Sequence, residues 1–193
     1  MDSLIAAMEG LVEDIYGHVH RVSGVSISIG EILGLSPVDL DRLATVGVLH
    51  DVGKLHVDTR LLSKPASLDV PEVEHMQRHT LFGFAMTADL FEREVSEAIL
   101  FHHERFDGSG YPHGRAGDEI PLLARIVAVA DAYDAITSER AYQPALPSAF
   151  ALQEIRTYSG TQFDPMIVEA FLDSVSDGSF ETTQRLVLDL AAS

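Results

Sequence analysis

The chain has 193 residues, 46% of them hydrophobic, which is enough for one domain with a sizeable core. Its formal net charge of −17 opposes binding to a nucleic-acid polymer or an anionic membrane, because both require clustered Lys and Arg. The absence of cysteine excludes disulfides and thiolate metal sites. No apolar run is long enough to span a membrane and no secretory leader is evident, so we expect a cytoplasmic protein.

Apolar residues at helical spacing predict a first helix over residues 3–16 and a second over residues 17–33. In the second helix, His18 and Arg21 are three residues apart and share a face. Asp14 lies four residues before His18 and shares that face if the helix is continuous. On local evidence alone, His18 is more simply interpreted as an exposed or half-buried imidazole.

The next helix is predicted to begin at Ser36 and Pro37, which are favourable residues at the N-cap and first helical positions, and to run to His50. The stretch His50-Asp51-Val52-Gly53-Lys54 then combines groups that bind metals and phosphates. A single His-Asp pair is weak evidence, because most such pairs are surface or capping residues. Residues 55–62 are expected to be irregular or to form short turns.

Pro71 is predicted to open another helix, with His79 on its inward face. A further helix over residues 94–101 ends in His102 and His103. Consecutive residues on a helix point about 100° apart. These two histidines would therefore bind two neighbouring metals more easily than one, unless one binds while the other packs.

A loop over residues 105–120 is longer than most connections, and such loops are often functional, although its glycines and proline also suit a plain turn. Residues 122–137 form a strongly apolar predicted helix that contains Asp131 and Asp134. Buried carboxylates are costly unless they are paired or bind a metal. We favour metal binding for Asp131 and a hydrogen bond or salt bridge for Asp134.

Helices are also predicted over residues 147–158 and 165–175, and strand patterning is absent. The sequence therefore predicts an all-α, single-domain bundle of about seven or eight helices over residues 1–175. Residues 176–193 are predicted to form a linker and a helix that packs on the domain or mediates homodimerisation. Helical bundles hold metals through side chains on facing helices, and the many candidate ligands suggest two metals, which suits phosphate-ester hydrolysis.

The motifs occur in the order His18-x-x-Arg21, His50-Asp51-Val52-Gly53-Lys54, His79, His102-His103-Glu104-Arg105, Asp107-Gly108-Ser109-Gly110-Tyr111-Pro112 and Asp131-x-x-Asp134 with Arg140. This ordered set resembles the HD-GYP family, a branch of the HD phosphohydrolase superfamily, over roughly residues 15–175. The resemblance implies an all-α fold with a GYP loop and a metal-dependent phosphodiesterase that acts on cyclic di-GMP.

The resemblance also implies which side chains bind metal. These ligands are His18, His50, Asp51, His79, His102, His103 and Asp131. Asp51 would bridge two divalent metals, for which iron or manganese is expected. Some members hold a third metal through a glutamate at the position of Asp14, whose side chain is one methylene shorter, so two metals are the default expectation.

The implied reaction is attack of a metal-bridging hydroxide on phosphorus with departure of the 3′-oxygen, which yields pGpG and then GMP. Asp51 and Lys54 would be catalytic, and both Lys54 and Arg140 would bind substrate phosphate. Gln143 stands three residues after Arg140, where family members often have a basic residue. This difference predicts a weaker hold on the second phosphate, or a changed substrate or product.

Gly110, Tyr111 and Pro112 would lie beside the bound substrate. The resemblance is also compatible with a non-catalytic module, in which this loop contacts a GGDEF-type or sensor partner. It leaves open a phosphodiesterase for another cyclic dinucleotide, including the mixed GMP-AMP one, and an HD phosphohydrolase for different nucleotides. Tyr111 and the complete ligand set argue against a degenerate member, and a purely structural domain would leave Asp131 unexplained.

Overall fold

The structure, a computed structural model, is described in the following ranges. They are residues 15–62, 64, 66–139, 144–178, 180, 182, 183, 185 and 187. The α-helices are α2 (Ile15–Ile32), α3 (Pro37–Leu49), α4 (Thr59–Leu62), α5 (Val70–Gln77), α6 (His79–Thr87), α7 (Arg93–Phe101), α8 (Leu122–Thr137), α9 (Ser148–Thr157) and α10 (Pro165–Ser176). Short 3-10 helices, η1 (Val52–His56) and η2 (Gly117–Glu119), lie between them. The described residues contain no β-strand, so the predicted all-α fold is confirmed.

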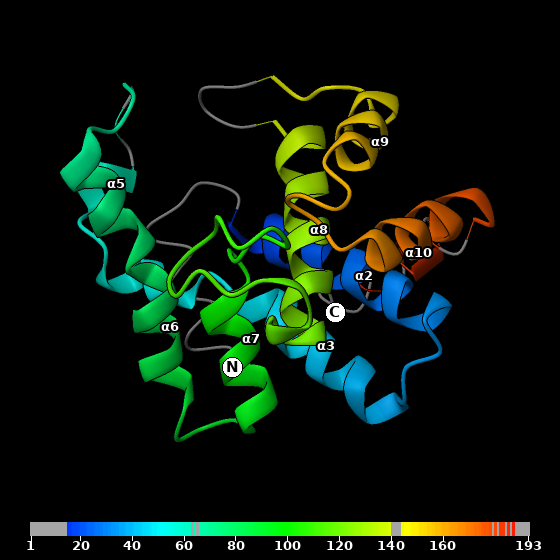
Figure 1. Cartoon of the computed structure of the whole chain (residues 1–193), viewed down its shortest axis with the longest axis horizontal. Helices are drawn as coiled ribbons and strands as arrows, with labels where there is room; N and C mark the ends of the chain where they lie inside the picture. Colours follow the sequence, from blue (N-terminus) through cyan, green and yellow to red (C-terminus); the bar gives the residue numbers. More distant parts are fainter. Residues whose placement is uncertain are drawn as a thin grey trace.

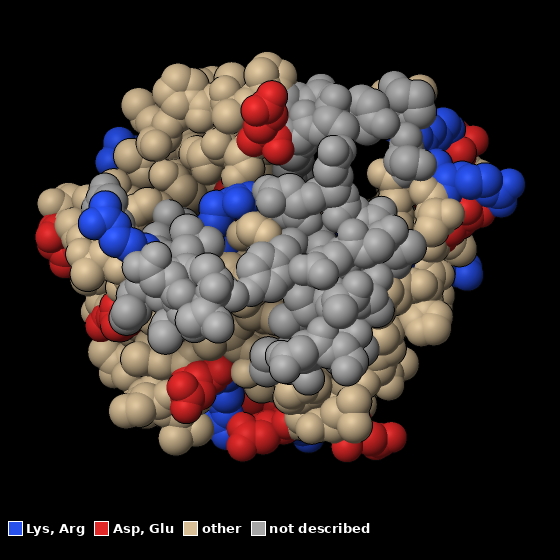
Figure 2. All heavy atoms as spheres, turned by 180° about the vertical axis from the view of Figure 1, so that it is seen from behind, with Lys and Arg blue, Asp and Glu red and all other residues tan. Residues whose placement is uncertain are grey.

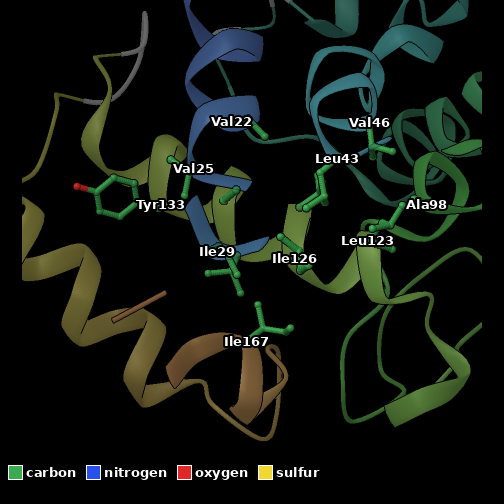
Figure 3. Packing of buried hydrophobic residues seen from close by; sticks show 14 of the residues in the cluster. Val22, Val25, Ile29, Leu43, Val46, Ala98, Leu123, Ile126, Tyr133 and Ile167 are labelled. Carbon is green, nitrogen blue, oxygen red and sulfur yellow. The ribbon is translucent and has the colours of Figure 1, made fainter. Parts of the chain in front are cut away.

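Helix α8 lies at the centre of the bundle, where α2, α3, α7, α9 and α10 all pack against it (Figure 1). Apolar side chains from several of these helices meet in one core (Figure 3). Ile29 of α2, Leu43 of α3, Ile126 of α8 and Ile167 of α10 are each fully buried there. Their burial removes apolar surface from water and is the main favourable term for folding.

Local sequence explains where several helices begin and end. Ser36 accepts a hydrogen bond from the Asp39 N–H group at the start of α3, as its N-cap position predicts. Gly34 follows α2 with a φ of 68°, which a glycine adopts without steric cost. The long apolar helix was also predicted with the bounds that α8 has.

Two predicted helices differ from the structure. The expected boundary between residues 16 and 17 is wrong, because α2 is continuous from Ile15. The helix expected to open at Pro71 is divided at Arg78 into α5 and α6. Its start is fixed by a capping box between Asp69 and Glu72. The predicted helix over residues 3–16 lies largely outside the described residues.

The surface of the described residues is mixed in charge. On the face shown in Figure 2, lysine and arginine side chains are scattered, and several of them lie next to acidic side chains.

Near the C-terminal end, the Phe180 ring packs against Tyr133 and Phe171, with centroids 5.3 and 6.2 Å away. Among the described helices, none has both the length and the apolar character that crossing a membrane requires.

Candidate metal centre

The predicted ligands come from separate helices and converge at one place. His18 lies on α2, His50 and Asp51 follow α3, His79 begins α6, His102 and His103 follow α7, and Asp131 lies on α8. Their ligand atoms form two groups, in each of which all atoms lie within 4.8 Å of one another. The first group is Asp51, His79, His102 and His103, and the second is His18, His50 and Asp51.

Asp51 belongs to both groups, and its two oxygens face different histidines. Its Oδ1 atom lies 3.5 Å from His79 Nε2, whereas its Oδ2 atom lies 3.5 Å from His50 Nε2 and 3.9 Å from His18 Nε2. Oδ1 is buried and has no hydrogen-bond partner among the described residues. This is the geometry of a carboxylate that can bridge two cations.

Lys54 sits one turn after Asp51 and its ammonium group contacts the Asp51 Oδ2 atom. Burial alone would raise the pKa of Asp51, but the charge of Lys54 and the neighbouring histidine rings together outweigh burial and hold that pKa well below the usual range. Asp51 is therefore ionised at neutral pH. The Lys54 side chain is 27% exposed, so it reaches from the buried carboxylate towards the surface.

Asp131 lies beside the second group. Its Oδ1 atom is 3.7 Å from His18 Nε2 and 4.0 Å from His50 Nε2. Its side chain is 22% exposed, which makes this the more open side of the cluster. A cation held by His18 and His50 would thus have a second carboxylate within reach.

Backbone carbonyls orient three of the rings. The Nδ1 atoms of His50, His79 and His102 lie 2.8, 2.8 and 2.7 Å from the carbonyl oxygens of the residues three positions before them. A carbonyl can only accept, so each Nδ1 carries the proton and each Nε2 presents a lone pair. Metal-binding histidines in proteins are fixed in this way.

The inward nitrogen atoms face one another at short range. His18 Nε2 lies 3.3 Å from His50 Nε2, and His79 Nε2 lies 3.4 Å from His102 Nε2. Burial lowers the pKa of His50, His79 and His102, so these imidazoles are neutral at pH 7. Two facing lone pairs repel each other unless a cation lies between them, so the donor set fits a metal centre.

Asp134 holds the His18 ring. Its Oδ2 atom accepts a hydrogen bond from His18 Nδ1 at 2.7 Å, and Arg21 Nε donates to its Oδ1 atom at 2.5 Å. Burial would raise the pKa of Asp134, but these two partners lower it to about 2. The predicted salt bridge of Asp134 is confirmed, and it leaves His18 Nε2 free to bind metal.

His102 and His103 do not divide between the two groups as helical spacing suggested. Both belong to the group with Asp51 and His79, and their ring centroids are 4.1 Å apart. The reason is local, because α7 ends at Phe101 and the two histidines lie in the turn that follows. Burial lowers the pKa of His103 to about 4, so it is also neutral at pH 7.

The loop over residues 105–120 packs directly on the cluster. The Tyr111 ring lies against His103 with a centroid separation of 4.9 Å, and burial raises the pKa of Tyr111. Gly110 is needed for this approach, because a Cβ atom there would lie 2.3 Å from the Arg105 nitrogen. The Tyr111–Pro112 peptide bond is cis.

Sequence reasoning missed the role of Glu104 as a support for this loop. The side chain is buried, and its two oxygens accept hydrogen bonds from the backbone N–H groups of His113 and Arg115 at 2.7 and 3.1 Å. Its position directly after two predicted ligands was the available signal. Glu104 thus fixes the loop that carries Tyr111.

Sequence reasoning also missed why position 53 must be a glycine. A Cβ atom at this position would lie 1.8 Å from the carbonyl oxygen of His79, so only glycine allows η1 to approach α6 this closely. The approach brings Asp51 to the first group of histidines.

Three residues singled out in the sequence, Asp14, Arg140 and Gln143, lie outside the described residues.

The sequence matches the family model of the HD domain over residues 4–167. Since this match spans most of the chain, the chain belongs to the HD domain family. Within that family, the resemblance to the HD-GYP branch that the ordered motifs predicted is confirmed by the relatives found.

The chain is similar to a cyclic di-GMP phosphodiesterase of Thermotoga maritima, with 41% identity over 158 residues that cover 80% of this chain and 43% of the relative. It is 33% identical over 174 residues to 3′3′-cGAMP-specific phosphodiesterase 2 of Vibrio cholerae, covering 89% of this chain and 33% of the relative. The chain therefore spans less than half the length of these curated relatives.

A crystal structure of a cyclic GMP-AMP specific phosphodiesterase of Vibrio cholerae matches the fold with a TM-score of 0.71 and 24% sequence identity. The match covers 97% of this chain and 52% of that chain. Family membership and the buried His/Asp cluster together support divalent metal binding.

Proposed function

We propose that this chain is a metal-dependent phosphodiesterase for a cyclic dinucleotide, with cyclic di-GMP as the first candidate substrate. The observation that carries the proposal is the position of Asp51, whose two oxygens face two separate groups of histidines. The similarity to cyclic di-GMP and cGAMP phosphodiesterases supports the substrate class.

The centre would hold two divalent metals, iron or manganese. Asp51 would bridge them, with His79, His102 and His103 on one and with His18, His50 and Asp131 on the other. Bound there, such metals supply an activated water and polarise the phosphoryl oxygen. Asp14 would add a ligand if a third metal binds, and the metal stoichiometry tests this.

The surrounding side chains would bind and orient the phosphodiester. Lys54 contacts Asp51 and is partly exposed, so its ammonium group can move to a phosphate oxygen at the mouth of the centre. Tyr111 stays protonated at neutral pH because burial raises its pKa, so its hydroxyl can donate a hydrogen bond to the substrate. Arg140 would bind a further phosphate oxygen.

The overall reaction adds one water across a phosphorus–O3′ bond. Cleavage of one of the two diester bonds gives linear pGpG, and cleavage of the second gives GMP. The product mixture also reports on Gln143, because a weaker hold on the second phosphate would make pGpG accumulate.

The proposal is tested with the anaerobically purified protein, incubated with cyclic di-GMP before and after treatment with a chelator. We expect pGpG, followed by GMP, from the untreated sample and no product from the chelated one, with recovery on adding Fe²⁺ or Mn²⁺. Hydrolysis that persists in the fully metal-free protein would contradict the proposal, as would a metal-loaded protein that cleaves no cyclic dinucleotide.

A further inference from the structure

A cavity of about 350 Å³ opens beside the candidate metal centre. It shares His102, His103 and Asp131 with the centre, and its remaining wall is formed by Glu104, Arg105, α8, α9 and the chain that follows α9. Its volume lies in the range of small-molecule sites. A group attached to a phosphate held at the centre would enter this cavity.

The walls of the cavity suit a flat aromatic ring. Ala128, Ala132 and Ala135 of α8 face it and leave the space open, because they have no side chain beyond Cβ. Ile155 and Phe163 supply buried apolar surface, and the half-exposed Tyr158 ring lies on the same lining. Nucleobases stack on such surfaces, mostly regardless of base type, so these walls do not by themselves select a base.

Two polar side chains in the cavity lining can distinguish one nucleobase from another. Gln162 uses its Oε1 atom to accept a hydrogen bond from Arg105 at 2.7 Å, which leaves its NH₂ group able to donate to a ligand. Glu154 of α9 is half-buried, and its carboxylate makes no hydrogen bond or ion pair with any residue that the structure describes. The cavity therefore offers a carboxylate acceptor and an amide donor.

An unpaired carboxylate is unfavourable in a site for an anionic phosphodiester, and the net charge of −17 adds to this cost. A ligand that displaces water from this half-buried carboxylate must bring hydrogen-bond donors to replace it. Guanine carries two neighbouring donors, N1–H and the 2-amino group, next to the O6 acceptor. Adenine has an acceptor at N1 and no 2-amino group.

We propose that this cavity is a guanine site in which Glu154 accepts from N1–H and the 2-amino group and Gln162 donates to O6. The ligand class rests on the proposed function, and the inference adds the residue that selects the base. It predicts that cyclic di-GMP and the mixed GMP-AMP dinucleotide bind, whereas cyclic di-AMP is rejected.

The test measures the dissociation constants of GMP and AMP for the metal-loaded protein by equilibrium dialysis. We expect wild type to prefer GMP, and Glu154→Ala to weaken GMP binding roughly 10- to 100-fold, as loss of charge-assisted hydrogen bonds does, with AMP binding unchanged. Equal affinities of wild type for both nucleotides would overturn the inference, as would equal losses for both in the variant.

Glu169→Ala is the matched control, because it removes one negative charge from an exposed position on α10 that is not part of the cavity. It should leave both dissociation constants unchanged. Ala135→Leu fills the cavity and should weaken GMP and AMP together. Far-UV circular dichroism establishes that each variant retains its helices.

Turnover separates this inference from the proposed function. If cyclic di-GMP is hydrolysed and Glu154→Ala leaves the preference over cyclic di-AMP unchanged, the guanine site is wrong while the function stands. If cyclic di-GMP, cyclic di-AMP and the mixed GMP-AMP dinucleotide are all left intact but GMP binding is selective and depends on Glu154, the guanine site stands while the proposed function is wrong.

Discussion

The apolar core and the histidine–aspartate cluster share helices, yet burial stabilises the apolar side chains of the core and destabilises the charged side chains of the cluster. On α8, Ile126 and Val127 are fully buried in the core, while Asp131 and Asp134 belong to the polar side. Burial stabilises the first pair and penalises the second. The core therefore provides the stability with which the domain holds a costly set of ligands together.

Among the substitutions considered, Asp51→Ala should damage the histidine–aspartate cluster most, because it removes the carboxylate common to both histidine groups. Changes to residues that only orient a metal ligand already cost about 10- to 100-fold in metal affinity or activity, so we expect turnover of cyclic di-GMP to fall at least about 100-fold. The far-UV spectrum should stay unchanged, and the exposed Asp41→Ala variant serves as control. Unimpaired turnover would exclude this centre.

The corresponding change in the core is Phe171→Ala. The ring is fully buried and packs against Tyr133 and Phe180, so its loss should lower the free energy of unfolding by about 3–5 kcal/mol in urea titrations. The folded fraction should still bind the same number of metals. A loss of metal without a loss of stability would show that the two regions are not separable.

Asp134→Ala acts at the border of the two regions. Without its carboxylate, His18 loses the hydrogen bond that fixes its Nδ1–H tautomer, so we expect metal affinity to fall about 10- to 100-fold. Competition with a metal-binding dye measures this. Asp58→Ala, which removes a partly exposed carboxylate paired with Arg60, should leave the affinity unchanged. Equal affinities in both variants would remove the positioning role of Asp134.

Glu104→Gln has the smallest expected effect. Glutamine keeps one acceptor and places an amide group against a backbone N–H group, so the loop should lose on the order of 1 kcal/mol of local stability. Hydrogen exchange of the His113 and Arg115 amides should accelerate, whereas exchange in α8 should not. Unchanged exchange at both loop amides would mean that Glu104 does not hold the loop.

The sequence was most informative where one local signal decides the structure. Ser36 and Pro37, which favour the N-cap and first helical positions, predicted the start of α3. The strongly apolar segment over residues 122–137 predicted the bounds of α8. The ordered motifs also predicted the side chains that converge on Asp51. Their roles as ligands remain predictions that the metal measurements test.

The missed features depend on contacts between residues far apart in the chain. The clash that makes Gly53 necessary involves the carbonyl oxygen of His79, and no local pattern contains that distance. The division of the helix at Arg78 was equally invisible to helical periodicity. The end of α7 before His102 was predicted, but the predicted helix end did not show that both histidines would join the same group.

The most direct test of a metal centre around Asp51 is the metal content of anaerobically purified protein, measured beside the Asp51→Ala variant. We predict two equivalents of iron or manganese per chain in the wild type and a clear loss in the variant. A third equivalent is the result expected if Asp14 supplies a ligand for a further metal. Absence of bound metal in the wild type, even after reconstitution with Fe²⁺ or Mn²⁺, would contradict the account.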